Sequence, residues 1–362
     1  MAFDLDSALA QSVAAGASDL HVKVPSRPRM RVNGVLVNLP KGEPLNPQDT
    51  ARVKEQVLTS EVKQRQFEEI GSTDISYFTD EARYRVSAFL QRGTASFVFR
   101  VVPHAPEVED LGLPDVIPSW ADAIRGLVVV TGPTGSGKST TVAAIIDIVN
   151  RRRSCHILTI EDPIEYLHTD HKAVVCQREI GLDAPTYHVA LRAALRQDPD
   201  VIVIGEVRDE ETAMTALRAS ETGHLVLCTM HTVNATETVQ RFIDLFGSSQ
   251  AGLARQVLAS TLVGISSQRL LPGANGGRVL NAEVLVNSAR VRDMIAGHVE
   301  QKDIEQAIRE GDYYGMQTFD QDLMHQVRDG LVTVEDAIAY ATDPHDFKLA
   351  LDTSEPIPAR TR

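Results

Sequence analysis

Two kinds of hydrophobic pattern divide the chain. In the first hundred residues, stretches in which apolar and polar residues alternate, as on half-buried strands, are mixed with stretches of helical spacing. The expected helices are 6–14 and 47–69, and the expected strands are 20–24, 30–37, 74–77, 84–90 and 96–102. Asn46 and Pro47 suit the N-cap and first position of the second helix, and Asn33-Gly34 suits a hairpin turn. This pattern predicts an α+β domain that is rich in strands and has two helices.

From Trp120 onward the pattern changes to apolar runs without alternation, separated by stretches of helical spacing. The runs are 127–130, 156–160, 201–204 and 225–230, and the helical stretches are 139–150, 187–196, 210–221 and 235–246. Continuous apolar strands between helices indicate a parallel sheet that is covered on both faces, which is the α/β class. After residue 289 the spacing predicts mainly helices, at 291–296, 301–310, 319–329 and 334–341.

Residues 103–118, between these two regions, contain four prolines and several acidic residues, a composition typical of a linker. We therefore expect an N-terminal domain at 1–102 and a second domain at 119–290. A helical C-terminal segment is expected at 291–350. The last residues, 351–362, are polar and are expected to be disordered.

Composition narrows the function classes. The 362 residues contain 36 Lys and Arg against 49 Asp and Glu, a net charge of −13, and phosphate neutralisation by a nucleic-acid-binding protein needs the opposite balance. Three cysteines, Cys155, Cys176 and Cys228, are too few for a disulfide framework or a tetracysteine zinc site, and we expect them to be small buried residues in a reducing cytosol. No window approaches 18 apolar residues, so no membrane span is expected.

A phosphate-binding loop is the clearest chemical motif. The sequence G-x-x-x-x-G-K-[ST] lies between an apolar run and a helical stretch, as the motif requires. Its glycines allow backbone N–H groups to curl around phosphate oxygens, and the helix N-terminus adds partial positive charge. Lys138 is expected to reach the β and γ phosphates of ATP, and Ser139 to coordinate Mg²⁺. The expected nucleotide-binding residues are Gly132, Pro133, Thr134, Gly135, Ser136, Gly137, Lys138, Ser139 and Thr140.

Hydrolysis also needs acidic residues near the metal and the attacking water. The run 156–160 leads into Glu161-Asp162-Pro163-Ile164-Glu165, and the run 201–204 leads into Gly205-Glu206-Val207-Arg208-Asp209, with Gly205 where many such strands carry Asp. One acid is expected to hold Mg²⁺ through water and another to polarise the attacking water. His224 and His231 flank the run 225–230, and each either contacts the γ-phosphate, relays its presence, or is structural.

Several long motifs in one order identify a resemblance. The phosphate loop, EDPIE, GEVRDEET and TGHLVLCTMHT resemble the secretion-type hexameric ATPases. GASDLH near the start, RYRVSAF, FVFR and GMQTFDQD narrow the resemblance to the PilT/PilU branch, the type IV pilus retraction ATPases. It extends from about residue 4 to about residue 350. The family's AIRNLI segment appears in an altered form as Arg290-Val291-Arg292-Asp293-Met294-Ile295, which retains Arg292 at the position of its arginine.

The resemblance implies a PAS-like N-terminal domain, a RecA-like P-loop core and a hexameric ring with ATP between subunits. By position, Glu165 matches the water-activating glutamate and Glu206 the Walker B glutamate near Mg²⁺. Arg85 and Arg100 match arginines that reach ATP across a subunit interface. The motifs also place Arg208 and His224 among the nucleotide-binding residues and His231 among the catalytic ones.

The expected function is therefore an ATP-driven motor of pilus retraction. It would work at the cytoplasmic side of the inner membrane with a platform protein and a paralogous pilus ATPase, and without nucleic acid. The alternatives are a RecA-like nucleic-acid translocase and a non-retraction pilus or secretion ATPase of the same superfamily. The missing tetracysteine subdomain argues against pilus assembly. A GTPase would need an N-K-x-D motif, which the sequence lacks, whereas a nucleotide sensor would bind ATP without turnover.

Overall fold

The computed structural model describes residues 3–40, 42–297 and 300–353. The chain divides into two compact units, Met1–Pro103 (unit 1) and His104–Arg362 (unit 2). In the described residues we find no helix with the length and hydrophobicity needed to cross a bilayer. The predicted arrangement, an α+β domain followed by a P-loop core, is confirmed.

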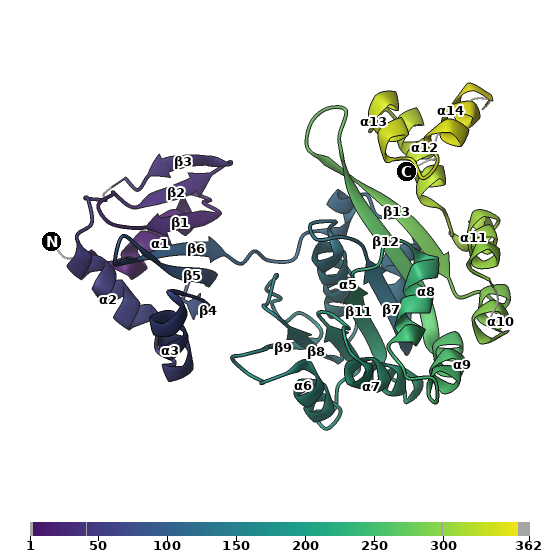
Figure 1. Ribbon diagram of the computed structural model, residues 1–362, viewed down its shortest axis with the longest axis horizontal. Helices are drawn as coiled ribbons and strands as arrows, with labels where there is room; N and C mark the ends of the chain where they lie inside the picture. Colours follow the sequence, from purple (N-terminus) through teal and green to yellow (C-terminus); the bar gives the residue numbers. More distant parts are fainter. Residues whose placement is uncertain (1–2, 41, 298–299, 354–362) are drawn as a thin grey trace. The chain divides into compact units, whose positions relative to one another are not determined.

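Unit 1 is a six-stranded antiparallel sheet with three helices (Figure 1). The sheet order is β3-β2-β1-β6-β5-β4. Its strands are β1 (Asp19–Val22), β2 (Arg29–Val32), β3 (Val35–Asn38), β4 (Ser72–Phe78), β5 (Arg83–Gln91) and β6 (Thr94–Val101), and its helices are α1 (Leu5–Ala14), α2 (Pro47–Val57) and α3 (Glu61–Ile70). Tyr84, Phe97 and Phe99 are fully buried in its core. The alternation in the sequence is therefore that of a sheet with one buried face.

The single helix predicted over residues 47–69 is wrong, because the structure has α2 and α3 there. Leu58 leaves the helical conformation and is buried in the core, and Ser60 is the N-cap position of α3. Thr59 and Ser60 are residues whose side chains favour helix ends over helix interiors.

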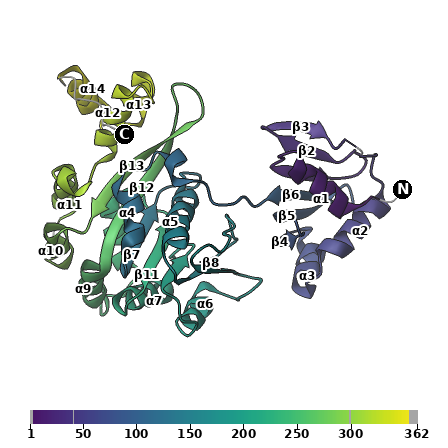
Figure 2. The same cartoon turned by 180° about the vertical axis from the view of Figure 1, so that it is seen from behind.

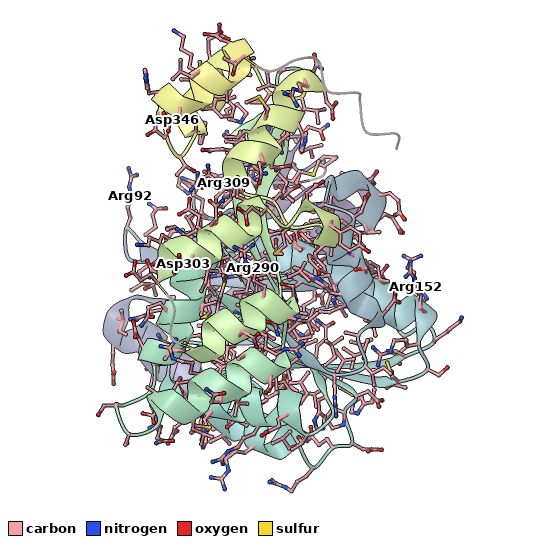
Figure 3. The ribbon with its side chains drawn as sticks, turned by 90° about the vertical axis from the view of Figure 1, so that its right-hand side faces the viewer. Arg92, Arg152, Arg290, Asp303, Arg309 and Asp346 are labelled. Carbon is pink, nitrogen blue, oxygen red and sulfur yellow. The ribbon has the colours of Figure 1, made fainter. Side chains whose placement is uncertain are left out.

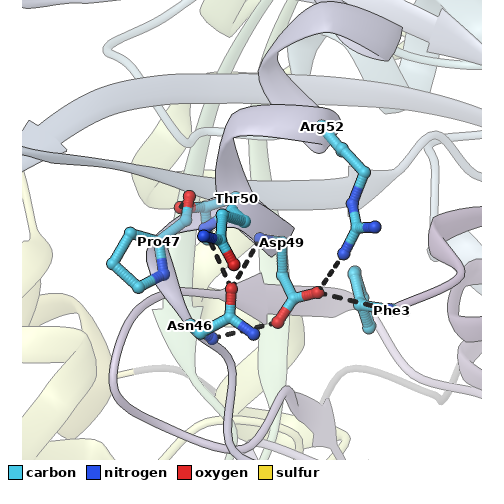
Figure 4. A network of polar contacts seen from close by, with 7 residues as sticks. Phe3, Asn46, Pro47, Asp49, Thr50 and Arg52 are labelled. Carbon is cyan, nitrogen blue, oxygen red and sulfur yellow. Dashed lines mark hydrogen bonds and ion pairs between the residues drawn. The ribbon is translucent and has the colours of Figure 1, made fainter. Parts of the chain in front are cut away.

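The predicted N-cap of α2 is present and links two parts of unit 1 (Figure 4). The side-chain oxygen of Asn46 accepts the N–H groups of Gln48 (2.9 Å) and Asp49 (3.1 Å), and the Asp49 carboxylate accepts the N–H of Asn46 (3.0 Å). Asp49 also accepts the N–H of Phe3 (3.3 Å) and pairs with Arg52. The pKa of Asp49 is lowered by these donors, of which the Asn46 N–H has the largest effect. Through its bond to Phe3, the carboxylate that caps α2 also holds the N-terminal segment.

Unit 2 is built on a mixed sheet with the order β13-β12-β7-β11-β10-β8-β9, parallel except for β13 (Figures 1 and 2). The strands are β7 (Gly126–Thr131), β8 (His156–Glu161), β9 (Val174–Glu179), β10 (Val201–Ile204), β11 (Leu225–Met230), β12 (Leu262–Pro272) and β13 (Arg278–Val286). The helices around the sheet are α5 (Lys138–Arg152), α6 (Tyr187–Ala194), α7 (Glu210–Glu221), α8 (Ala235–Asp244), α9 (Ala251–Thr261), α10 (Ala289–Gly297) and α11 (Gln301–Arg309).

Both faces of this sheet are covered, as the continuous apolar runs predict. Val128 and Val130 of β7 pack with α5, whereas Leu127 and Val129 of the same strand pack with α7, α8 and α9 on the other face. Because β7, β8, β10 and β11 are parallel, their carboxyl ends meet at one edge. This edge is where ligands bind in open α/β sheets.

Residues 104–118 are not a free linker, which corrects the expectation for this segment. They belong to unit 2 and contain the short helices η1 (Val108–Leu111) and α4 (Val116–Ser119). Ile117 is fully buried beside α5, and Glu107 pairs with Arg151 of that helix (2.9 Å). The apolar residues between the prolines therefore fix this segment to the core.

The C-terminal segment is helical, as predicted, and continues with α12 (Phe319–Arg328), α13 (Val334–Tyr340) and α14 (Pro344–Thr353). Figure 3 views this side of the molecule and labels Arg290 on α10, whose guanidinium pairs with Glu310 after α11 (2.6 Å). Residues 351–353, expected in the disordered tail, end α14, and residues 354–362 lie outside the described residues. Of the cysteines, Cys228 is buried as expected, but Cys176 is exposed.

Candidate active site

The loop between β7 and α5 has the backbone that phosphate binding requires. Gly132 has φ +142, and a Cβ there would lie 2.4 Å from the carbonyl oxygen of Gln268. Gly137, with φ +92, is the N-cap residue of α5. The Oγ of Ser136 is buried and has no hydrogen-bond partner in the part of the chain that the structure describes. An unpaired buried hydroxyl fits a loop whose donors face a phosphate group.

Lys138 begins α5 and folds back over this loop. Its Nζ donates to the carbonyl oxygens of Gly132 (2.8 Å) and Pro133 (2.9 Å). Burial lowers the pKa of Lys138, and the negative charge of Glu206 acts in the opposite direction. The structure therefore places an ammonium group at the mouth of the loop and Glu206 within its electrostatic reach.

A cavity of about 480 Å³ opens beside the loop. It is lined from the loop and α5, and from the segments that follow β8, β10 and β11. The sequence-predicted residues that line it are Thr134, Gly135, Gly137, Lys138, Ser139, Thr140, Glu165, Glu206 and His231. The structure thus brings most of the predicted site residues together at one edge of the sheet.

Glu206 follows β10 and is held by two basic side chains. Its Oε2 lies 2.5 Å from Nη2 of Arg208, and its Oε1 lies 3.3 Å from Nε2 of His231. Burial acts to raise the pKa of Glu206, but the hydrogen bonds and charges of Arg208 and His231 outweigh it, so this pKa is lowered. An ionised carboxylate at this position suits a cation.

The segment after β8 carries two glutamates in different surroundings. Glu161 accepts hydrogen bonds from Thr159 (2.7 Å) and from Gln177 (3.2 Å), and its other oxygen accepts the N–H of Glu165 (3.3 Å). Burial raises the pKa of Glu161 despite these donors. The side chain of Glu165, by contrast, is exposed and lines the cavity, which makes it the accessible carboxylate of the pair.

The structure explains why glycine stands at position 205. A Cβ on Gly205 would lie 2.9 Å from the hydroxyl oxygen of Tyr187 and 3.2 Å from the carbonyl oxygen of Ile160. Tyr187 lines the cavity, and burial together with neighbouring acids raises the pKa of its hydroxyl, which keeps it neutral. An Asp at position 205 would therefore collide with this tyrosine.

His224 is not brought to the phosphate loop, in contrast to the expectation for both histidines. It precedes β11, whereas His231 follows it, and β11 pairs in parallel with β7 so that Leu225 lies opposite Gly126. Six strand residues separate the two ends by roughly 20 Å. The His224 imidazole instead bonds to the carbonyl oxygen of Ala219 (2.9 Å), which is a structural contact.

Arg85 and Arg100 belong to unit 1, where they lie opposite each other on β5 and β6. Both are exposed on the face of the sheet away from the core. Nε of Arg100 donates to Oδ1 of Asp19 (2.9 Å). Burial acts to raise the pKa of Asp19, but Ser18 and Arg100 outweigh it and this pKa is lowered. Asp19 therefore stays ionised and holds the Arg100 side chain in place.

The oxygen groups of the cavity suit Mg²⁺. Ser139 supplies a hydroxyl and Glu206 a carboxylate that its neighbours keep ionised, and both line the cavity. Magnesium usually binds through one or two protein oxygens and completes its shell with water and substrate phosphates. The residues present therefore fit this ion.

The tyrosines of the cavity, Tyr166 and Tyr187, were not among the residues predicted from the sequence. Tyr166 directly follows the EDPIE motif, and its hydroxyl is hydrogen-bonded to Thr140 Oγ1 (2.8 Å). The position of Tyr166 beside Glu165 was the available signal. Tyr187 is distant in sequence from both acidic motifs, so no sequence pattern indicated that it would line the cavity.

Comparisons with known proteins identify the family of this chain. Residues 2–339 match the family described as type II/IV secretion system protein. The chain is 41% identical to the type IV pilus retraction ATPase PilT of Pseudomonas aeruginosa, over 95% of this chain and 100% of the relative. It is 38% identical to the type IV pilus ATPase PilU of the same organism, over 96% and 91%. A crystal structure of the pilus retraction motor PilT with bound ADP superposes with a TM-score of 0.85 at 41% identity, covering 96% and 99% of the two chains.

Proposed function

Because this chain belongs to the type II/IV secretion system protein family and to its PilT/PilU branch of ATPases, we propose that it works as a hexameric motor that powers the retraction of type IV pili. The observation that carries the proposal is the extent of the likeness to PilT, which includes unit 1 as well as the P-loop core. An ATPase that shared only the phosphate loop would match in unit 2 alone.

The residues around the cavity support a route for ATP hydrolysis. Lys138 binds the β and γ phosphates and stabilises the charge that develops on the leaving oxygen. Ser139 and Glu206 would hold Mg²⁺, which would supply positive charge to neutralise the developing negative charge. Glu165 accepts a proton from the attacking water, whose oxygen bonds to the γ-phosphorus while the bond to the β–γ bridging oxygen breaks. ADP and phosphate are the products.

The two exposed arginines of unit 1 complete the proposal. We assign Arg85 and Arg100 to the ATP of a neighbouring subunit, since they lie side by side on one open sheet face. An arginine supplied in this way is typically worth about 10³–10⁵ in rate. Hydrolysis would then depend on ring assembly.

The cellular location and partners that we propose also follow from membership of the PilT/PilU branch. We place the motor at the cytoplasmic face of the inner membrane, with a membrane platform protein and a paralogous pilus ATPase as partners. The net charge of −13 does not favour nucleic acid as a partner. A secretion ATPase without a role in retraction is the alternative, and the altered segment Arg290–Ile295 is the observation that favours it.

The test is a deletion of the gene, complemented with the native chain, Lys138→Ala or Glu165→Gln. Labelled pili should extend but not retract in the deletion strain and with either variant, and retraction should return with the native gene. Normal retraction without the gene would refute the motor function. Phosphate release that rises with single-stranded DNA would identify a translocase instead.

The roles of the two acidic residues are separated in vitro. Glu165→Gln should bind ATP normally and turn it over very slowly. Glu206→Gln should also shift the Mg²⁺ concentration that gives half-maximal activity, because this residue is assigned to the ion. The opposite result, with the magnesium shift in Glu165→Gln alone, would exchange the two roles.

A further inference from the structure

The loop that carries Glu165, residues 161–168, is fixed by side chains on both sides of this glutamate. Immediately before it, the N–H of Ile164 donates to Oε2 of Glu179 (3.1 Å). Immediately after it, the carbonyl oxygen of Tyr166 accepts from Nε2 of Gln177 (2.8 Å). The backbone of Glu165 is therefore clamped from two residues of one strand, β9.

The side chain of Gln177 makes three hydrogen bonds to this loop. Besides its bond to Tyr166, its Nε2 donates to Oε1 of Glu161 (3.2 Å), and its Oε1 accepts the N–H of His168 (3.0 Å). The amide thus uses its donors and its acceptor on three different residues of the loop. β9 pairs in parallel with β8, with Thr159 opposite Gln177, so a regular strand sets the position of the amide.

The same loop is tied to the phosphate-binding helix. The hydroxyl groups of Tyr166 and Thr140 are hydrogen-bonded (2.8 Å), and Thr140 lies in the first turn of α5, next to Ser139. Gln177 thereby holds the backbone beside Glu165, and Tyr166 ties that backbone to the first turn of the phosphate-binding helix α5. Both bonds meet at a single residue, Tyr166.

We propose that Gln177 is a positioning residue for ATP hydrolysis, which holds Glu165 at the place from which it activates water. The proposal rests on the role assigned to Glu165 under the proposed function. Displacing a reacting group by about 1 Å can cost on the order of 10²-fold in rate, and Gln177 fixes the carbonyl group of the residue that follows this glutamate. It acts through the backbone, and its contacts include no residue of the phosphate loop among those described.

A purely structural role makes a different prediction. Gln177 also donates to the partly buried Glu161 carboxylate, and a lost donor there would destabilise the fold whatever happens to Glu165. In that case turnover, ATP binding and thermal stability would fall together. A positioning role lowers kcat while ATP binding remains.

The experiment is a double-mutant cycle on the full-length protein with Gln177→Leu and Glu165→Gln. Gln177→Glu serves as a second variant that keeps the shape and the acceptor for His168 but loses the donor to Tyr166. Gln240→Leu is the matched control, because it removes an amide–carboxylate bond, to Asp244 (2.6 Å), on the surface of α8. Phosphate release, the Kd of a fluorescent ATP analogue and the melting temperature are measured for each.

We expect Gln177→Leu and Gln177→Glu to lower kcat about 10–100-fold, as loss of supporting hydrogen bonds around a catalytic group typically does, with Kd within twofold of native. In the Glu165→Gln background, Gln177→Leu should cause no further loss. Three results would overturn the proposal: native kcat in Gln177→Leu beside an inactive Glu165→Gln, the same fold-loss in both backgrounds, or a loss that follows ATP binding. Native turnover in Glu165→Gln would instead refute the role of Glu165 itself, and this inference with it.

Discussion

Glu283 allows a quantitative prediction of stability against pH. This carboxyl group on β13 is buried, and its Oε1 accepts the N–H of Ala235, the first residue of α8 (2.8 Å). Burial raises the pKa of Glu283 to about 7; the Ala235 bond and Arg269 oppose the rise, and the charges of Glu305 and Asp320 add to it. The perturbation is Glu283→Gln, which keeps an oxygen for Ala235 and removes the ionisable group.

The sign follows from proton linkage. An unfolded Glu ionises near pH 4.5, whereas folded Glu283 stays protonated to about pH 7, so the native protein loses stability between these values as pH rises. Below pH 4.5 both states are protonated and the group has no effect. A pKa difference of this size corresponds to roughly 3 kcal/mol, lost by pH 8 in the native chain but not in Glu283→Gln.

The assay is urea unfolding followed by tryptophan fluorescence at pH 5, 6, 7 and 8. The chain has a single tryptophan, Trp120, which is buried in unit 2, so the signal reports the unit that contains Glu283. Relative to native, Glu283→Gln should gain stability progressively up to pH 7 and then remain level. Glu221→Gln, at the exposed end of α7, is the control and should follow the native curve. A gain that is equal at pH 5 and pH 8 would refute the reasoning.

Three further outcomes are expected. Lys138→Ala should abolish phosphate release because it removes the ammonium at the loop, and near-native turnover would remove the phosphate-loop assignment. Mixing inactive Arg100→Ala subunits with Lys138→Ala subunits should restore part of the activity, since each supplies what the other lacks; full activity of a strictly monomeric preparation would contradict an arginine acting between subunits. Gly205→Ala should cost about 1–3 kcal/mol of stability from overpacking, and Tyr187→Phe should recover part of it; strictly additive losses in the melting experiment would show that the two residues do not collide.

The phosphate loop could be predicted because its signal is contiguous. The residues from Gly132 to Thr140 are adjacent in sequence and lie between an apolar strand and a helix, so local rules are enough. The positions of Glu165 and Glu206 could be predicted in the same way, because each lies in a segment that follows an apolar strand of the same parallel sheet. For the histidines the direction of β11 also matters, because a parallel strand brings only its carboxyl end to this edge of the sheet: His231, at that end, lines the cavity, and His224 does not.

β12 and β13 were missed because their support is long-range. Ser266, Ser267 and Gln268 interrupt the apolar run of β12 with polar residues, yet all three are fully buried. Their partners are distant in sequence: Thr131 donates to Ser267 (2.9 Å), and Gln268 donates to Thr141 (2.8 Å). Such residues resemble a loop until the strand that satisfies them is known.

The segment 104–118 has a mechanical consequence. A free tether of sixteen residues reaches up to ~55 Å when extended, but with this segment fastened to unit 2 only Pro103 and its neighbour are left, a reach of about 7 Å. The covalent connection between the two units is thus only about two residues long. The first fastened residues pair with the backbone of Leu167, two positions after Glu165, where Ala105 donates to its carbonyl oxygen (3.3 Å). The covalent connection from unit 1 therefore joins unit 2 next to the segment that carries Glu165, two residues from Leu167.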